Sequence, residues 1–367
     1  MKINGKHPAL IVYEELPLNA APPLQLLREN FITPQELFFV RNHAPVPKIE
    51  EADYRLIVDG MTNTPLQLTL EDIRKNFPSE TVTATLQCAG NRRDELMKVA
   101  ETPGELPWGA EAISNATWTG APLREILRAA NVTANVNTEM KHIAFTGLDE
   151  VERQNRRFGF GGSIPLEKAL SAEVLLAYEM NDEPLAPTHG FPLRAVVPGY
   201  IGARSVKWLS RITLQAEPSD NYFQAHAYKL FPPQANAETV DWSGGLMLGE
   251  QSLNAVICCP QECENVRAGR VVIQGYAMAG GDRRIERVDI SIDNGETWTI
   301  ATLPEERPSW AWCLWEAALD MKAGECEIVA RAVDSAANTQ PEHARYIWNF
   351  KGYMNNAWHR VKVRCVE

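Results

Sequence analysis

Residue types suited to metal or thiol chemistry are concentrated in one short run, Thr85-Leu86-Gln87-Cys88-Ala89-Gly90-Asn91-Arg92-Arg93. Cys88 follows a strand-like stretch, and the two adjacent arginines would favour its thiolate form. Gly90 lacks a Cβ and would let the backbone approach a ligand closely. From these residues alone, Cys88 is equally open to interpretation as a buried core residue and as a ligand or nucleophile.

A cysteine nucleophile would need a base within reach. Four of the seven histidines are candidates for this base, but all lie far from Cys88 in the sequence and none is singled out: His43, His142, His189 and His226. Cys258, Cys259 and Cys263 have no second pair or histidine at zinc spacing. The chain has no C-x-x-C-H, P-loop, G-x-S-x-G or H-E-x-x-H motif, so an electron carrier would have to be separate or differently bound.

Composition restricts the class of protein. The chain has 367 residues, 45% hydrophobic and 23% charged, which predicts about two globular domains. Its 36 Lys and Arg against 47 Asp and Glu give a net charge of −11, which argues against a nucleic-acid partner.

No apolar run is long enough to span a membrane, and residues 1–8 lack the features of a secretory signal. The odd number of cysteines, seven, fits a reducing compartment. We therefore expect a cytoplasmic protein with no membrane partner, or a periplasmic one if a leader has been removed.

The elements that position these residues fall into two blocks. Helix and strand signals are mixed in the first two thirds, whereas the last third has almost only strand and turn signals. We expect an α+β domain over residues 1–240, followed by an all-β, immunoglobulin-like sandwich without a disulfide over residues 241–367. The seam is expected in the Pro- and Gly-rich stretch from Phe231 to Gly245.

Local patterns support this division. Residues 122–131 predict a helix with Leu123, Ile126, Leu127 and Ala130 on one face. Residues 163–170 predict the start of another helix, and residues 53–60 and 172–178 predict buried strands. Residues 287–293 alternate apolar and polar before Asn294-Gly295, which predicts a type I′ hairpin to residues 297–300. The tryptophan-rich residues 309–315 fit either the sandwich core or a homodimer interface.

The run around Cys88 resembles the molybdenum-ligand motif of the sulfite oxidase family of molybdopterin enzymes. Five further segments resemble signatures of that family in the same order: residues 38–47, 106–108, 189–194, 202–208 and 357–361. The resemblance extends from about residue 30 to the C-terminus and includes both expected domains. It implies a molybdopterin-binding domain of the sulfite oxidase fold and a second domain that forms a homodimer, for which a two-fold axis is the simplest arrangement.

The resemblance also implies the roles of the reactive residues. Cys88 would bind molybdenum, because a soft thiolate suits such a metal. The implied reaction is oxidation of sulfite to sulfate by oxygen-atom transfer, with electrons passed to an external acceptor. Arg41 and Tyr228 would contact the oxyanion, the first because a guanidinium fork matches paired oxygens. Trp108 would form a wall of the pocket.

A larger set would hold the molybdopterin by the same resemblance. Cations, hydroxyls and amides suit its phosphate, while carboxylate and imidazole suit its ring nitrogens. For each residue a purely structural role is the alternative. The expected contacts are Phe39, Asn42, His43, Asp149, His189, Arg194, Ser205, Val206 and Lys207.

The chain departs from the family pattern in two places. Lys351, in Phe350-Lys351-Gly352, stands where the family has a second pocket arginine. Lysine keeps the charge but loses the fork, which predicts retained oxyanion binding with sulfite bound more weakly or in another orientation. The family's pocket lysine between the Cys motif and the Trp is not evident in residues 101–105, so we expect substrate steering to differ.

The electron acceptor and two alternative functions stay open. About 30 residues precede the part of the chain that resembles the family, too few for a cytochrome b5-type domain, so we expect no haem in this chain. The acceptor would be dioxygen or a separate cytochrome. The alternatives are a related enzyme acting on nitrate, another oxyanion or an S-oxide, and a non-enzymatic scaffold. Gln87 and Tyr228 fit sulfite better than nitrate, and molybdenum content would exclude a scaffold.

Overall fold

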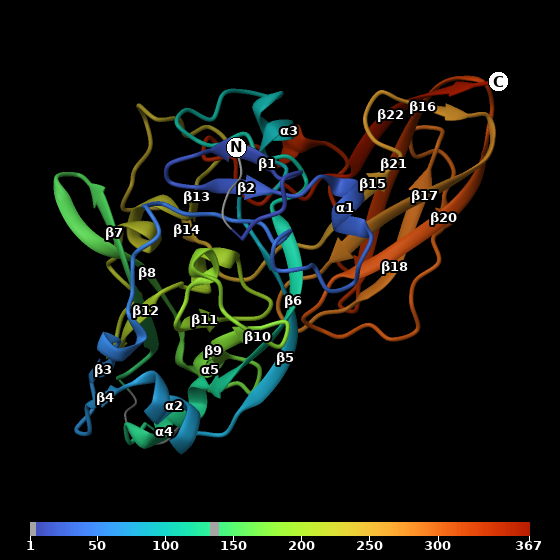
Figure 1. Cartoon of the computed structure of the whole chain (residues 1–367). Helices are drawn as coiled ribbons and strands as arrows, with labels where there is room; N and C mark the ends of the chain where they lie inside the picture. The colour runs from blue at the N-terminus through green and yellow to red at the C-terminus, as the bar shows by residue number, and fades with distance from the viewer. Residues whose placement is uncertain (1–4, 133–138) are drawn as a thin grey trace.

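The computed structural model describes residues 5–132 and 139–367, and it places an α+β part beside a β sandwich (Figure 1). We expected no secretory signal in residues 1–8. Residues 1–4 of this segment lie outside the described residues. The predicted order, a mixed domain followed by an all-β domain, is confirmed.

One sheet of the first part ends at the Cys88 run. It is antiparallel, with strand order β10-β9-β6-β5 and β11 also paired to β9. Gln87 is paired with Ile113 as the last step of the ladder between β5 and β6, so Cys88 emerges where the sheet ends. The strands are β5 (Glu80–Gln87), β6 (Ile113–Pro122), β9 (Leu175–Met180), β10 (Glu183–Pro184) and β11 (Arg194–Val196).

A second sheet of the first part has the order β4-β3-β12-β7-β8, in which β12 runs parallel to β3 and the other neighbours are antiparallel. Apolar side chains from both sheets, such as Leu56, Ile143 and Leu176, form the largest core cluster. The strands are β3 (Leu56–Gly60), β4 (Leu66–Leu68), β7 (His142–Arg153), β8 (Arg156–Pro165) and β12 (Leu209–Gln215).

Short helices and two small strand pairs complete the first part. The predicted helix after Pro122 is confirmed as α4, which buries Leu123, Ile126 and Leu127. In α2 a capping box between Thr69 and Asp72 satisfies the first free backbone donors. The remaining elements are α1 (Leu24–Arg28), α2 (Leu70–Asn76), α3 (Arg93–Met97), α4 (Leu123–Ala129), α5 (Leu166–Ala169), β1 (Ile11–Glu14), β2 (Asn19–Ala21), β13 (Lys229–Leu230) and β14 (Leu246–Met247).

The second part consists of a three-stranded sheet, β15-β17-β20, and a five-stranded sheet, β16-β22-β21-β18-β19. Their facing side chains form a separate core. The predicted hairpin is confirmed: Asn294 and Gly295 have φ of 59° and 90°, as a type I′ turn requires. The strands are β15 (Asn254–Cys259), β16 (Glu264–Arg267), β17 (Gly269–Met278), β18 (Ile285–Ser291), β19 (Thr299–Ile300), β20 (Cys313–Met321), β21 (Gly324–Asp334) and β22 (His359–Val366).

Contacts between the two parts hold the Cys88 run in place. Arg92 is fully buried, and its Nη1 donates to Asn254 Oδ1 at 2.7 Å and to the Ala357 carbonyl at 2.8 Å. In the tryptophan-rich segment, Trp315 lies in the sandwich core, whereas Trp312 packs on Tyr276 at the junction. Both side chains are buried within the chain.

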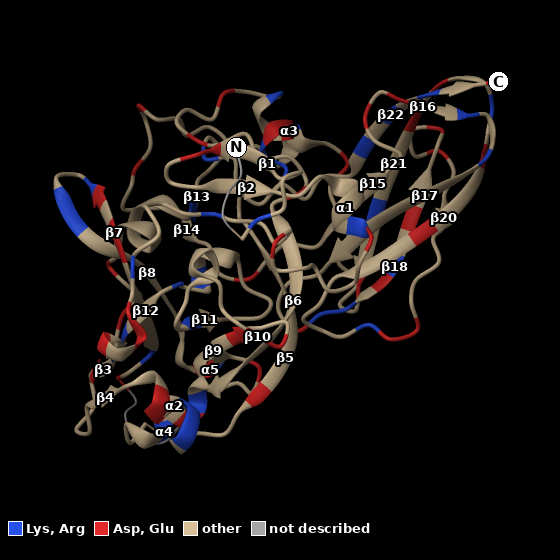
Figure 2. Ribbon diagram, in the orientation of Figure 1, with Lys and Arg blue, Asp and Glu red and all other residues tan. Residues whose placement is uncertain are grey.

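Charges are interspersed over both parts, and the tip of the β7–β8 hairpin is basic (Figure 2). Among the helices of the described residues, none is long and apolar enough to cross a membrane.

Candidate active site

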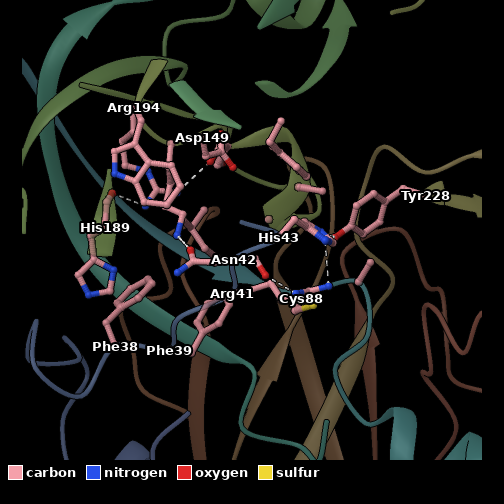
Figure 3. Close-up of a pocket in the computed structure, with 18 residues that line it drawn as sticks. Phe38, Phe39, Arg41, Asn42, His43, Cys88, Asp149, His189, Arg194 and Tyr228 are labelled. Atoms are coloured by element: carbon pink, nitrogen blue, oxygen red, sulfur yellow. Dashed lines mark hydrogen bonds between the residues drawn. The ribbon is translucent and has the colours of Figure 1, made fainter. Parts of the chain in front are cut away.

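A cavity opens beside the end of β5, lined by aromatic and polar side chains. Cys88, His43 and Tyr228 lie toward one end, and Phe38, His189 and Arg194 lie toward the other (Figure 3). Most of the predicted site residues line it: Phe39, Arg41, Asn42, His43, Cys88, Asp149, His189, Arg194, Ser205, Lys207 and Tyr228.

Cys88 is fixed by the backbone that follows β5. Its N–H donates to the Ala112 carbonyl at 2.9 Å, and its Sγ accepts from the Gly90 N–H at 3.4 Å. A Cβ on Gly90 would lie 2.3 Å from Arg93 Nη2, so only glycine leaves room for this guanidinium. Cys88 lines the cavity, and its sulfur is held in place by the Gly90 N–H.

Arg41, His43 and Tyr228 form a directed hydrogen-bond chain. Arg41 Nη2 lies 3.2 Å from His43 Nδ1, and His43 Nε2 lies 2.9 Å from the Tyr228 hydroxyl oxygen. A guanidinium can only donate, so Nδ1 accepts and the neutral imidazole carries its proton on Nε2. Burial, with nearby cations adding, holds the pKa of His43 well below its usual range. The Tyr228 oxygen thus accepts from His43, which leaves its own proton for another acceptor in the cavity.

Tyr228 remains a donor over the working pH range. It follows the short π-helix Phe223–Ala227, is buried, and stacks on Tyr353 with ring centroids 5.2 Å apart. Burial raises its pKa to about 12. Burial opposes the charge on Arg41, but Tyr228 and Cys88 favour it and the net effect raises its pKa. This end of the cavity therefore offers a fixed cation and a neutral hydroxyl.

The opposite end is rich in cations. Arg194 begins β11, and its Nη1 and Nη2 donate at 3.0 Å to the carbonyls of His189 and Ser205. Lys207 Nζ donates to Asn42 Oδ1 and, at 3.1 Å, to the Thr188 carbonyl. At this end of the cavity, Arg194 and Lys207 are accompanied by a single carboxylate among the lining residues, that of Asp149. This excess of positive charge suits an anionic group such as a phosphate.

Two polar atoms in the cavity wall lack partners. Asn42 Nδ2 and Asp149 Oδ1 are buried and make no hydrogen bond to any described residue, an arrangement that costs free energy unless a ligand satisfies it. Burial raises the pKa of Asp149 to about 7, and burial together with Arg194 lowers the pKa of Lys207 well below its usual range. A ligand that carries both a phosphate and ring N–H groups would relieve these costs, so the residues fit molybdopterin.

Three predicted residues lie elsewhere. Trp108 is fully buried behind Cys88, in a core cluster with Phe38 and Trp118, and does not line the cavity. Val206 is 1% exposed and packs in the main core. Lys351 is bound to Glu105 beyond the lining of the cavity.

Two residues with structural roles at the site were missed. Asn19 Oδ1 accepts from Arg41 Nη1 at 3.1 Å and from the Asn42 N–H at 2.8 Å, and so holds Arg41 and Asn42 in place. Lys6 Nζ lies 2.6 Å from His189 Nε2 and donates to the carbonyls of Gln35 and Phe38 at 2.7 and 2.9 Å. Neither residue stands in a chemical motif, and only tertiary folding brings them to the site.

Comparisons with known proteins agree with this geometry. Residues 43–223 match the oxidoreductase molybdopterin binding domain, and residues 247–366 match the Mo-co oxidoreductase dimerisation domain. Mitochondrial sulfite oxidase of Homo sapiens is 47% identical over 367 residues, which cover 98% of this chain and 66% of the human protein. The chain therefore spans about two thirds of that relative.

Two further proteins are similar over most of their length. Sulfite oxidase of Arabidopsis thaliana is 42% identical over 376 residues, covering 98% of this chain and 95% of the plant protein. The crystal structure of the sulfane dehydrogenase SoxCD from Paracoccus pantotrophus superimposes with a TM-score of 0.80 at 28% identity, over 96% of this chain and 88% of that one. Since sequence, fold and cavity agree, the chain belongs to the sulfite oxidase family of molybdopterin oxidoreductases.

Proposed function

We propose that this protein oxidises sulfite to sulfate with a molybdenum–molybdopterin cofactor and passes the electrons to an external acceptor. The carrying observation is that Cys88, Arg41 and Tyr228 meet at one end of a cavity whose other end holds surplus cations and unpaired polar atoms. When bound, the cofactor would supply two-electron oxygen-atom transfer.

The cavity residues divide between cofactor and substrate. The Cys88 sulfur would hold the metal. The residues proposed to hold the pterin and its phosphate are Phe39, Asn42, His43, Asp149, His189, Arg194, Ser205 and Lys207. Val206 stays a predicted contact, which its backbone would have to make because its side chain is buried in the core.

Arg41 and Tyr228 are proposed to bind the substrate. Asn19 and the Asn42 carbonyl fix the Arg41 guanidinium, at 3.1 and 2.5 Å from Nη1, so its charge is placed before an oxyanion arrives. The Tyr228 O–H, freed by the His43 contact, can donate to a substrate oxygen. Trp108 would support this end only through packing behind Cys88.

The remaining proposals concern partners and context. We propose a homodimer formed through the second domain, because residues 247–366 match a dimerisation domain. A domain boundary after residue 240 falls inside the connection between β13 and β14, which pair with each other. Dioxygen or a separate cytochrome as acceptor, the lack of haem and a cytoplasmic or periplasmic location stay predictions.

The test is steady-state turnover by molybdenum-loaded protein with metal analysis of the same sample. Sulfite is offered with ferricyanide, cytochrome c or dioxygen, and nitrate is offered with a reduced viologen. Sulfite turnover at about one molybdenum per chain supports the proposal. Nitrate reduction without sulfite turnover would support the nitrate alternative, and a protein that takes up neither metal nor pterin would support a scaffold.

A further inference from the structure

A buried carboxylate joins two cations near the cavity. Glu105 Oε1 accepts a hydrogen bond from Lys351 Nζ, and Glu105 Oε2 lies 3.4 Å from Arg93 Nη2. The side chains are 12%, 17% and 2% exposed, respectively. Salt screens such buried charges much less than surface charges, so this bridge affects the field nearby.

The carboxylate of this bridge reaches a hollow next to the cavity. Glu105 lines an outer hollow together with Arg41, His43, Arg153 and Glu14. Because Arg41 and His43 also line the main cavity, the two hollows adjoin. An anion that approaches Arg41 through the outer hollow therefore passes Glu105.

The two cations differ in how firmly their side chains are held. Arg93 Nε donates to the carbonyls of Lys351 and Gly352 at 3.2 and 3.1 Å, and its Nη1 donates to the Leu106 carbonyl at 2.9 Å. Its guanidinium also lies 5.0 Å from the centre of the Tyr353 ring, so it is rigid. Lys351 carries its charge on a flexible stem, and its ammonium can leave Glu105 for another acceptor.

The field of Glu105 reaches the reactive end. Burial is the main cause of the raised pKa of Tyr228 and of Tyr353, and the charge on Glu105 adds to both shifts. The Tyr353 ring lies between Arg93 and Tyr228, because it contacts the Arg93 guanidinium and stacks on the Tyr228 ring. The carboxylate thus acts on the same groups that an oxyanion would meet.

We propose that the Glu105 carboxylate competes with the substrate anion for the same cations. This competition sets the affinity of the protein for the anion. A carboxylate and an oxyanion are acceptors for the same N–H donors and repel each other when close. An anion bound in the outer hollow must therefore take Lys351, and part of the charge of Arg93, away from Glu105. This inference rests on the proposed function only in taking sulfite as the natural anion.

The first test measures sulfate binding to the molybdenum-loaded protein by calorimetry. Glu105→Gln keeps the shape and removes the charge, so sulfate should bind roughly tenfold more tightly, and nitrate should gain less because it carries a smaller charge. The matched control is Glu14→Gln. Glu14 lines the same hollow but accepts from Asn19 Nδ2 at 2.7 Å and forms no ion pair within the described part of the chain. Its loss should change sulfate affinity less than about twofold.

The second test asks whether Lys351 is the released cation. In a Lys351→Met background the gain from Glu105→Gln should shrink, because Arg93, which cannot move, is then the only cation whose charge Glu105 offsets. If Glu105→Gln does not fold, Glu105→Asp replaces it: the shorter side chain releases Lys351 but keeps the charge, so a smaller gain is expected. Unchanged or weaker sulfate binding in a folded Glu105 variant, an equal gain in Glu14→Gln, or an undiminished gain without Lys351 would each overturn the proposal.

The two proposals fail separately, because sulfate binding requires no turnover. Tighter sulfate binding in Glu105→Gln without any sulfite oxidation would support competition by Glu105 and reject the proposed reaction. Sulfite oxidation by the wild type, with sulfate affinity unchanged in Glu105→Gln, would support the proposed reaction and reject competition by Glu105.

Discussion

His43 Nε2 lies 2.9 Å from the Tyr228 hydroxyl oxygen, although 185 positions separate the two residues in the chain. The opposite ring nitrogen of His43 faces Arg41 at 3.2 Å. Since arginine can only donate, this contact determines which nitrogen of His43 carries the proton, and thereby the direction in which Tyr228 donates. His43 thus connects Arg41, which is proposed to bind the oxyanion, to the Tyr228 hydroxyl, whose orientation it sets.

Tyr228→Phe should lower kcat/KM for sulfite by roughly 100-fold, because it removes an oriented donor and leaves the His43 N–H without its acceptor. Steady-state kinetics of molybdenum-loaded protein measure this effect. Tyr222→Phe is the control, since Tyr222 is only half buried and does not line the cavity. Equal rates for Tyr228→Phe and wild type would exclude the hydroxyl from the reaction.

Cys88→Ser should leave a folded protein without turnover. The exchange of sulfur for oxygen alters little packing, whereas the hard hydroxyl replaces a soft thiolate ligand, so kcat should fall at least ~1,000-fold. Kinetics and thermal melting of one sample separate the two effects. Cys259→Ser, at a half-buried cysteine in the second domain, should retain activity. Activity in Cys88→Ser with full molybdenum content would contradict the assigned role.

Lys207→Met should lower the molybdopterin content of the purified protein. It removes a cation proposed to face the phosphate, and burial already disfavours the lysine charge when no anion is present. Metal and pterin analysis give the readout. The matched control is Lys229→Met, because Lys229 is also buried but donates to the Trp242 and Gly244 carbonyls outside the cavity. Loss of cofactor in both variants would indicate general destabilisation.

The stability of the protein should fall as the pH decreases below about 6.5, partly through His359. Burial lowers the pKa of His359 to about 3, and its Nδ1 accepts from the Ile257 N–H at 3.1 Å. Because its pKa is lower in the folded protein, the unfolded chain binds the proton first, and acid costs stability between the two pKa values.

The contribution of His359 should amount to about 2 kcal/mol between pH 7 and pH 5. Thermal melting at both pH values compares the wild type with His359→Gln, which has no titrating ring. The variant should lose less stability than the wild type over this interval. Parallel losses in the two proteins would show that His359 does not contribute.

Composition and local patterns predicted the two-domain order, and most of the cavity lining was predicted because Cys88, Arg41 and His189 stand in segments that resemble signatures of the sulfite oxidase family. Trp108 and Val206 were placed at the cavity by their motifs, whereas packing turns both side chains into the core. Asn19 and Lys6 could not be predicted, since their contacts depend on how the N-terminal segment folds over the first domain. The bridge between Glu105 and Lys351 likewise joins residues 246 positions apart.

The most direct test of the central claim needs no electron acceptor. Molybdenum-loaded protein is mixed anaerobically with a small excess of sulfite, and the sulfate formed is counted against bound molybdenum. A single oxygen-atom transfer predicts about one sulfate per molybdenum in the wild type and none in Cys88→Ser. Fully loaded wild-type protein that forms no sulfate would contradict the assignment of sulfite oxidation to this site.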